Sequence, residues 1–217
     1  MANQQHLDIL NQGKMAWKRW RLEHPRLRPD LSRVELSEAD LNGFDLSQTT
    51  LSDAILTGAN LSGTDLSGAN LHKANLTGAD LQVANLYKAN LISTDLSEAN
   101  LSGADLSETN LHRSDLSRAD MTGAKLVRAK LTGARLSGTN LSAADLRESS
   151  LVFAIMSQAN LMLANLSGAD LQQADLTAAD LRRANLSQAS LKGTNLSGAQ
   201  VTDEQLSEVT TLEEATL

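Results

Sequence analysis

Residues 69–78 read Ala-Asn-Leu-His-Lys-Ala-Asn-Leu-Thr-Gly, and this five-residue pattern continues through most of the chain. From Leu31 to Leu206 every fifth residue is apolar, thirty-six times in succession: thirty-three leucines, Met121, Met156 and Val201. Neither the helical period of 3.6 nor the strand period of 2 divides into five, so the pattern excludes a long amphipathic helix and an ordinary sheet. A short repeat maintained over this length predicts a solenoid.

The other positions of the repeat are nearly as regular. Two residues before each apolar residue stands Ala in twenty-four of the thirty-six repeats, Thr in six and Ser in two. In an extended segment these two residues point to the same side, which we expect to be the core, whereas the Asp or Asn between them faces outward. Two residues after the Leu lies the position that holds twelve of the thirteen glycines. Because a type II turn needs a positive φ at its third residue, this position predicts a corner every five residues.

Corners at this spacing make a polygon in cross-section. Four sides, or twenty residues per coil, accommodate inward Leu and Ala better than three or five sides. Residues 31–200 would then form eight to nine coils, about 40 Å long at about 4.8 Å per coil.

At this point the sequence resembles the pentapeptide-repeat family, whose pattern is A(D/N)LXX. The segments 69–73 (Ala-Asn-Leu-His-Lys) and 169–173 (Ala-Asp-Leu-Gln-Gln) match it fully, and the Leu-centred, Ala-rich repeats are similar to the cyanobacterial type. The resemblance implies an all-β solenoid, a right-handed quadrilateral parallel β-helix whose coils are hydrogen-bonded like parallel strands.

Composition removes several classes of function. The chain has no cysteine, which excludes disulfides, Cys-zinc sites and thiol nucleophiles. No run of 18 apolar residues and no signal-peptide pattern occurs, so we expect a cytoplasmic protein without a membrane partner. The four histidines do not cluster, the serines are explained by turns, and no phosphate-binding glycine loop is present. The sequence therefore predicts no catalytic residue, no cofactor, no metal and no enzyme.

Both ends of the chain depart from the repeat, which suggests three parts: a capping helix segment at 1–29, the β-helix at 30–200 and a C-terminal cap at 201–217. An open solenoid end exposes apolar core and needs a cover. We expect a helix over 4–23 whose apolar face plugs the first coil, with four contributing residues: Leu10, Trp17, Trp20 and Phe44. Six basic residues in this segment keep a partner-binding helix open as an alternative.

At the C-terminal end, residues 202–205 fit a capping box and predict a short helical lid. The five-residue spacing then resumes at Leu212 and at 215–217, displaced by one residue. We expect this segment to close the last coil.

Most outward positions hold either an uncharged polar residue or an acidic one. Two groups of residues depart from this rule. The first is apolar: Val152, Phe153, Ile155, Met162 and Leu163. With four sides, 152–153 and 162–163 fall on opposite corners and cannot form one patch. Either the coil is distorted locally, or the exposure is incidental, or one edge is a contact surface for a partner or a second copy. The second is a basic belt in the middle coils: Lys125, Arg128, Lys130 and Arg135. It is either a solvated surface or a contact for an anionic partner.

Three functions remain. The first is a non-enzymatic rod that acts as a protein-interaction scaffold or regulator, with an unidentified protein partner or, as an alternative, a homodimer. The second, implied by resemblance, is a DNA mimic that binds DNA gyrase. Residues 31–200 hold thirteen Lys and Arg against eighteen Asp and Glu, a net charge of −5, whereas DNA of similar length carries roughly 20 or more charges. The third is a spacer for a partner-binding N-terminal helix. Direct nucleic-acid binding is not expected.

Overall fold

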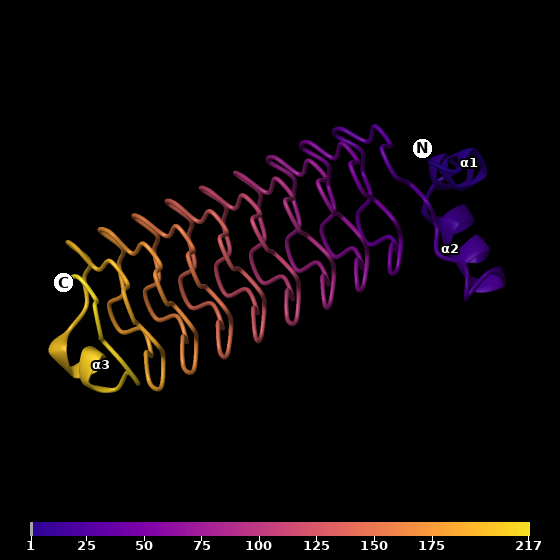
Figure 1. Ribbon diagram of the computed structural model, residues 1–217. Helices are drawn as coiled ribbons and strands as arrows, with labels where there is room; N and C mark the ends of the chain where they lie inside the picture. Colours follow the sequence, from indigo (N-terminus) through magenta and orange to yellow (C-terminus); the bar gives the residue numbers. More distant parts are fainter. Residues whose placement is uncertain (1) are drawn as a thin grey trace.

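The computed structural model of the protein describes residues 2–217. It is a slender rod of stacked coils (Figure 1). Helices α1 (Gln4–Asn11) and α2 (Lys14–Glu23) lie at one end, and helix α3 (Asp203–Ser207) lies at the other. The two ends of the chain are therefore separated by the whole length of the rod.

The coils are joined by parallel β-bridges between residues twenty apart, from Asp30 with Thr50 to Asp180 with Gln200. A bridging residue recurs every five residues, so each coil of twenty residues has four sides. This spacing confirms the coil length predicted from the sequence. Each side contributes a single bridging residue rather than a longer strand, because the chain turns again after five residues.

Each corner is a four-residue turn with a positive φ at its third residue. In the turn 51–54 the Ala54 N–H donates to the Leu51 carbonyl at 3.1 Å, and Asp53 has a φ of +57°. The same conformation recurs at every fifth residue from Arg33 to Gly198, whether or not that residue is glycine. The prediction from the glycines was therefore right but incomplete. From Arg33 to Ala178 the N–H of each corner residue also donates to the next coil, as Asp53 does to the His72 carbonyl at 2.9 Å, and this bond helps to hold residues with side chains in the left-handed region.

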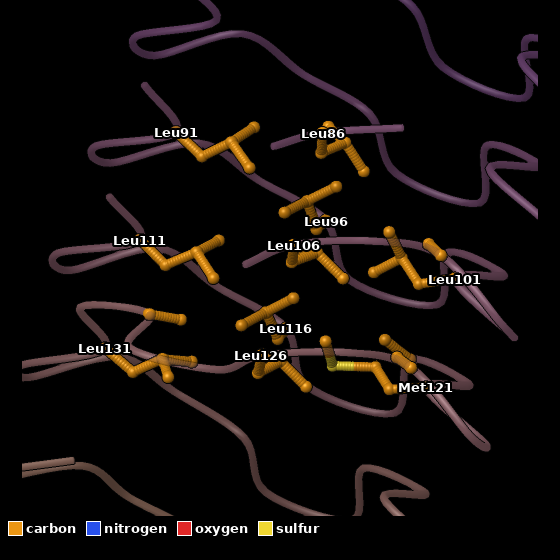
Figure 2. Packing of buried hydrophobic residues seen from close by; sticks show 14 of the residues in the cluster. Leu86, Leu91, Leu96, Leu101, Leu106, Leu111, Leu116, Met121, Leu126 and Leu131 are labelled. Atoms are coloured by element: carbon orange, nitrogen blue, oxygen red, sulfur yellow. The ribbon is translucent and has the colours of Figure 1, made fainter. Parts of the chain in front are cut away.

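The core consists of stacked columns of like side chains, mostly Leu in some columns and Ala in others. Figure 2 shows Leu91, Leu111 and Leu131 in one such column. From Leu41 to Leu196 each residue of the apolar series is buried, and each contributes roughly 1.5–3 kcal/mol before conformational entropy is subtracted.

Threonines that replace Ala beside this core are buried too, and their hydroxyls have partners. Thr139 Oγ1 donates to the Leu116 carbonyl in the preceding coil at 2.7 Å, and Thr64, Thr94 and Thr194 form the equivalent bond. The rod thus tolerates a hydroxyl in its interior because a carbonyl lies within reach.

The N-terminal segment forms two helices, so the prediction of one helix over 4–23 was wrong. Asn3 caps α1, its side chain accepting from the N–H groups of Gln5 and His6. The break comes at Gly13, whose φ of +92° is a conformation that glycine adopts without the cost a side chain would add. The break lets α1 fold back against α2 instead of extending away from the rod.

Helix α2 lies against the open end of the first coil. The structure places all four residues expected at this cap in one buried cluster with the Leu columns: Leu10, Trp17, Trp20 and Phe44. The indole N–H of Trp17 donates to the Asp45 carbonyl at 2.6 Å, and the rings of Trp17 and Trp20 are 5.3 Å apart. Indole rings thus occupy the place that a further coil would otherwise fill.

The C-terminal end is covered by α3 and one last extended segment. Thr202 and Gln205 form the capping box at the start of α3, and the Gln205 amide also donates to the carbonyls of Leu181 and Ala184, both at 2.8 Å. Beyond the helix, Thr211 bridges to Ser190, a spacing of 21 residues rather than twenty. This is the displacement by one residue read from the sequence, and α3 takes up the extra residue.

Candidate interaction surfaces

One corner of the rod carries three apolar residues, which we call the Phe153 edge: Val152, Phe153 and Ile155. Val152 and Phe153 form the corner itself, and Ile155 is the outward residue of the side that follows. Phe153 is 60% exposed and has a φ of +58°. An aromatic residue is therefore held in the left-handed region without being buried.

The neighbouring coils explain why Phe153 is exposed. The corner residue one coil earlier is Gly133, which has no side chain to cover the ring. One coil later stands Gln173, whose amide extends over Gly193, the next corner along, and so away from Phe153. The coil is regular here, because Phe153 N–H donates to the Gln172 carbonyl at 3.0 Å as at other corners. Local distortion, one of the three interpretations of this segment, is thus excluded, which leaves incidental exposure and a contact surface.

Cationic side chains flank the Phe153 edge on both sides. Lys130 bridges to Ser150 on the side that precedes the corner, and Arg135 bridges to Ile155 on the side that follows. Arg135 Nε lies 3.2 Å from Asp115 Oδ2. Partial burial alone would raise the pKa of Asp115, but hydrogen bonds from Ser117 and the Arg135 charge outweigh it, and the pKa lies below its ordinary value. Arg135 is therefore partly neutralised, whereas Lys130 forms no ion pair with any residue in 2–217.

Met162 and Leu163 lie half a coil further on, at the diagonally opposite corner. Leu163 is exposed and also has a positive φ, +63°. As expected from four sides, these two residues do not join the Phe153 edge.

The basic belt is not one patch either. Lys125 lies on a different side of the coil from Lys130, above Asp145 to which it bridges, and Arg128 occupies the corner between those two sides. Arg135 lies one side further round. A partner that meets the Phe153 edge could contact Lys130 and Arg135 together, but Lys125 faces elsewhere.

Sequence reasoning missed a difference between opposite sides of the rod. One side displays a column made only of Asp and Asn from Asp40 to Asp180, in which Asn amides donate to Asp carboxylates, as Asn60 does to Asp40 at 3.0 Å. The opposite side, half a coil away, carries no carboxylate at its bridging positions from Thr50 to Ser150 and includes Lys130. The signal was present in the sequence, but it appears only when residues twenty apart are aligned.

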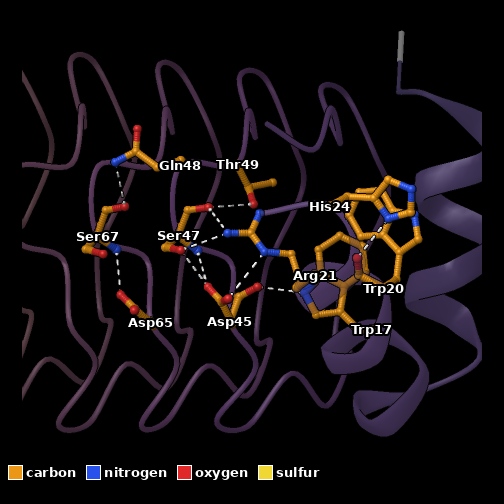
Figure 3. Close-up of polar contacts among 10 residues, drawn as sticks. All are labelled: Trp17, Trp20, Arg21, His24, Asp45, Ser47, Gln48, Thr49, Asp65 and Ser67. Atoms are coloured by element: carbon orange, nitrogen blue, oxygen red, sulfur yellow. Dashed lines mark hydrogen bonds and ion pairs between the residues drawn. The ribbon is translucent and has the colours of Figure 1, made fainter. Parts of the chain in front are cut away.

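At the N-terminal junction, polar contacts fix α2 to the first coil (Figure 3). The Arg21 guanidinium donates to Asp45 Oδ2 at 3.2 Å and to the carbonyl and hydroxyl oxygens of Ser47 at 3.0 and 2.9 Å. Burial alone would raise the pKa of Asp45, but hydrogen bonds from Ser47 and the Arg21 charge lower it below its ordinary value. The contact is built around an ionised carboxylate.

Residues 2–217 contain no group of three or more His, Asp or Glu side chains placed to hold a metal ion. The same residues include no helix long and apolar enough to cross a bilayer. Corner hydroxyls are engaged in local turns, as Ser97 is with Asp95 at 2.6 Å.

The repeat pattern agrees with the comparisons to known proteins. The profile of pentapeptide repeats matches in eight copies, over residues 30–68, 45–82, 84–123, 124–162 and 159–200. The chain belongs to the pentapeptide-repeat family. No curated protein sequence matches it.

Two solved structures illustrate the likeness. The first is HetL, a pentapeptide-repeat protein involved in heterocyst differentiation regulation in the cyanobacterium Nostoc sp.; it is 37% identical over 91% of this chain and 92% of HetL, with a TM-score of 0.52. The second is QnrB1, a plasmid-mediated fluoroquinolone resistance protein, 19% identical over 87% of this chain and 91% of QnrB1, with a TM-score of 0.59. The second likeness concerns the fold alone.

Proposed function

We propose that this protein is a non-enzymatic, rigid β-helical rod, wound right-handed as the family resemblance implies, that acts as a protein-interaction scaffold or regulator. The Phe153 edge is its contact surface for a protein partner. The absence of cysteine from the sequence fits the reducing cytoplasm as its compartment.

The observation that carries the proposal is the combination of strain and exposure at Phe153. A left-handed conformation costs an L-residue roughly 1–2 kcal/mol, and twelve other corners avoid that cost by using glycine. Phe153 recovers little of the cost by burial, since 60% of it is exposed. Folding alone therefore favours glycine at this corner, whereas a large aromatic side chain that is pre-positioned on a stiff support suits an interface anchor.

The surroundings of Phe153 indicate the chemistry of the partner. Lys130 and Arg135 lie on either side of the apolar corner, so the matching surface would have an apolar hollow with carboxylates at its rim. Such rim charges speed association and fix orientation more than they add affinity.

The similarity to HetL supports a regulatory or scaffolding role of this kind, since that protein is described as involved in the regulation of differentiation. The DNA-mimic alternative has weaker support. The acidic column has only four carboxylates from Asp40 to Asp180, with Asn at the other positions, and the opposite side of the rod bears cations. We expect purified protein neither to inhibit DNA gyrase supercoiling nor to protect the enzyme from a quinolone.

The experiment is affinity capture from cells of the source organism with four versions of the purified full chain: wild type, Phe153→Gly, Val83→Gly and Arg19→Glu. Val83 is the matched control, because it is also exposed and also has a positive φ, +50°, on another corner. Arg19 is exposed on α2 and tests the alternative that the N-terminal helices bind the partner. Captured proteins are identified and quantified by mass spectrometry.

We expect a partner that wild type, Val83→Gly and Arg19→Glu retain equally and that Phe153→Gly loses. Equal retention by Phe153→Gly would contradict the proposal. Loss with Arg19→Glu alone would favour the spacer alternative instead.

A further inference from the structure

A hollow of about 460 Å³ lies where α2 meets the first coil. Its lining combines cationic side chains with apolar ones, chiefly Lys14, Lys18, Arg21, Trp17 and Leu22. A site of this composition suits an occupant that is itself both acidic and apolar.

Much of the positive charge at this end is not neutralised. Arg21 is paired with Asp45, and only 11% of its side chain is exposed. Its Nη1 is nevertheless buried without a hydrogen-bond acceptor. Lys18 makes no ion pair with any residue of the described chain. Residues 1–30 hold six Lys and Arg against three Asp and Glu, a net charge of +3.

Apolar side chains also project from the outer surface of α2. Met15 is 76% exposed and Leu22 is 73% exposed. The cap that covers the core therefore presents an apolar and basic surface of its own, which capping alone does not require.

The opposite end of the rod has the complementary character. Residues 201–217 contain five Asp and Glu and no Lys or Arg, a net charge of −5. A smaller hollow of about 200 Å³ opens beside α3. The residues that line it include Leu196, Val201, Leu206 and Asp203, and polar atoms make up more of its exposed surface than apolar ones. Glu204 and Glu208 are exposed and form no ion pair among residues 2–217.

We propose that the acidic C-terminal cap of one copy docks on the basic N-terminal cap of a second copy, head to tail. The two caps lie at opposite ends of a stiff rod (Figure 1), so they cannot meet within one chain. Carboxylates around α3 face Lys18 and its neighbours, and the projecting side chains of α2 enter the hollow beside α3. The contact uses different surfaces on the two copies and leaves one free cap at each end, so it generates open chains rather than closed dimers.

The test measures self-association of the purified full chain by sedimentation velocity across a concentration series, at low and at high salt. Three charge variants are compared with wild type: Lys18→Glu, Glu204→Lys and, as a matched control, Lys73→Glu, which reverses an exposed charge at a corner of the rod. Tryptophan emission and circular dichroism verify that each variant is folded.

Wild type and Lys73→Glu are expected to form species that grow with concentration and are weakened by salt. Lys18→Glu and Glu204→Lys should each associate roughly tenfold or more weakly, because each places like charges in contact. An equimolar mixture of these two variants should recover association, since every contact in an alternating chain then joins opposite charges. A wild-type protein that stays monomeric, one that stops at a discrete dimer, or a mixture without recovery would each overturn the proposal.

Discussion

Replacing Val83 by glycine should stabilise the rod, although it removes a side chain. Val83 occupies a corner with a φ of +50° and is 64% exposed, so it is strained and contributes little buried surface. A β-branched residue is poorly suited to this region of backbone space. Removal of the strain of the left-handed conformation stabilises the folded state by about 1–2 kcal/mol. The greater conformational freedom of glycine in the unfolded chain destabilises the folded state by about 0.4–1 kcal/mol. We therefore expect a net gain of roughly 0.5–1 kcal/mol.

The matched control is Val127→Gly, one position earlier in the repeat. Val127 directly follows Leu126 and is not among the residues with a positive φ. The same substitution relieves no strain there, so it should destabilise the rod by about 0.5–1 kcal/mol through the entropy of glycine. Equilibrium urea unfolding followed by circular dichroism measures both changes. If both variants lose stability to the same extent, the corner conformation is not the source of strain and the reasoning is refuted.

Four further substitutions probe the N-terminal cap and the core. Trp17→Ala should cost about 3–5 kcal/mol in the stability of the N-terminal cap and expose the first coil, which light scattering would detect as aggregation. The pKa of Asp45 lies below its ordinary value, so the ionised carboxylate stabilises the N-terminal cap. This stabilisation is complete at a pH above the ordinary carboxyl pKa and is lost as the pH falls through the lowered pKa. Both tryptophans lie in this cap, so their emission should shift to the red in that acidic range, and Asp45→Asn should abolish the pH dependence of the shift. Thr139→Ala should cost only about 0.5–1.5 kcal/mol by urea unfolding, because the Leu116 carbonyl keeps its bond from Ala119 N–H, whereas Leu136→Ala should cost about 2–5 kcal/mol.

The rod could be predicted from the sequence because one period determines every level of its structure. The five-residue spacing from Leu to Leu determines how often the chain turns a corner. The Ala two residues before each Leu determines the width of the interior, and a coil of twenty residues follows from these two features. What the period could not reveal was the conformation of corner residues other than glycine. An intercoil hydrogen bond, such as that from Asp53 N–H to the His72 carbonyl, imposes it without any signal in the residue type.

The caps were harder to predict in detail. Helical spacing of Leu10, Trp17 and Trp20 identified a buried face, but it continues across Gly13 and so concealed the break between α1 and α2. The surfaces were hard to predict for a different reason. Which side chains share a surface depends on contacts between residues twenty apart, and these contacts exist only once the chain is wound into coils. Only that register separates Lys125 from Lys130 and places cations on either side of Phe153.

The two proposed contacts use separate parts of the rod. Head-to-tail chains would present one Phe153 edge per copy at a regular interval, because each copy would add one rod of the same length. A partner with several binding sites would then be held with an avidity above that of a single contact.

The central claim is that Phe153 is present for binding and not for folding. The most direct test measures the unfolding free energy of Phe153→Gly and its affinity for the captured partner in the same preparation. We expect changes in opposite directions: a stability gain of roughly 0.5–1 kcal/mol, as for Val83→Gly, together with loss of binding. A variant that loses stability and still binds as wild type does would contradict it.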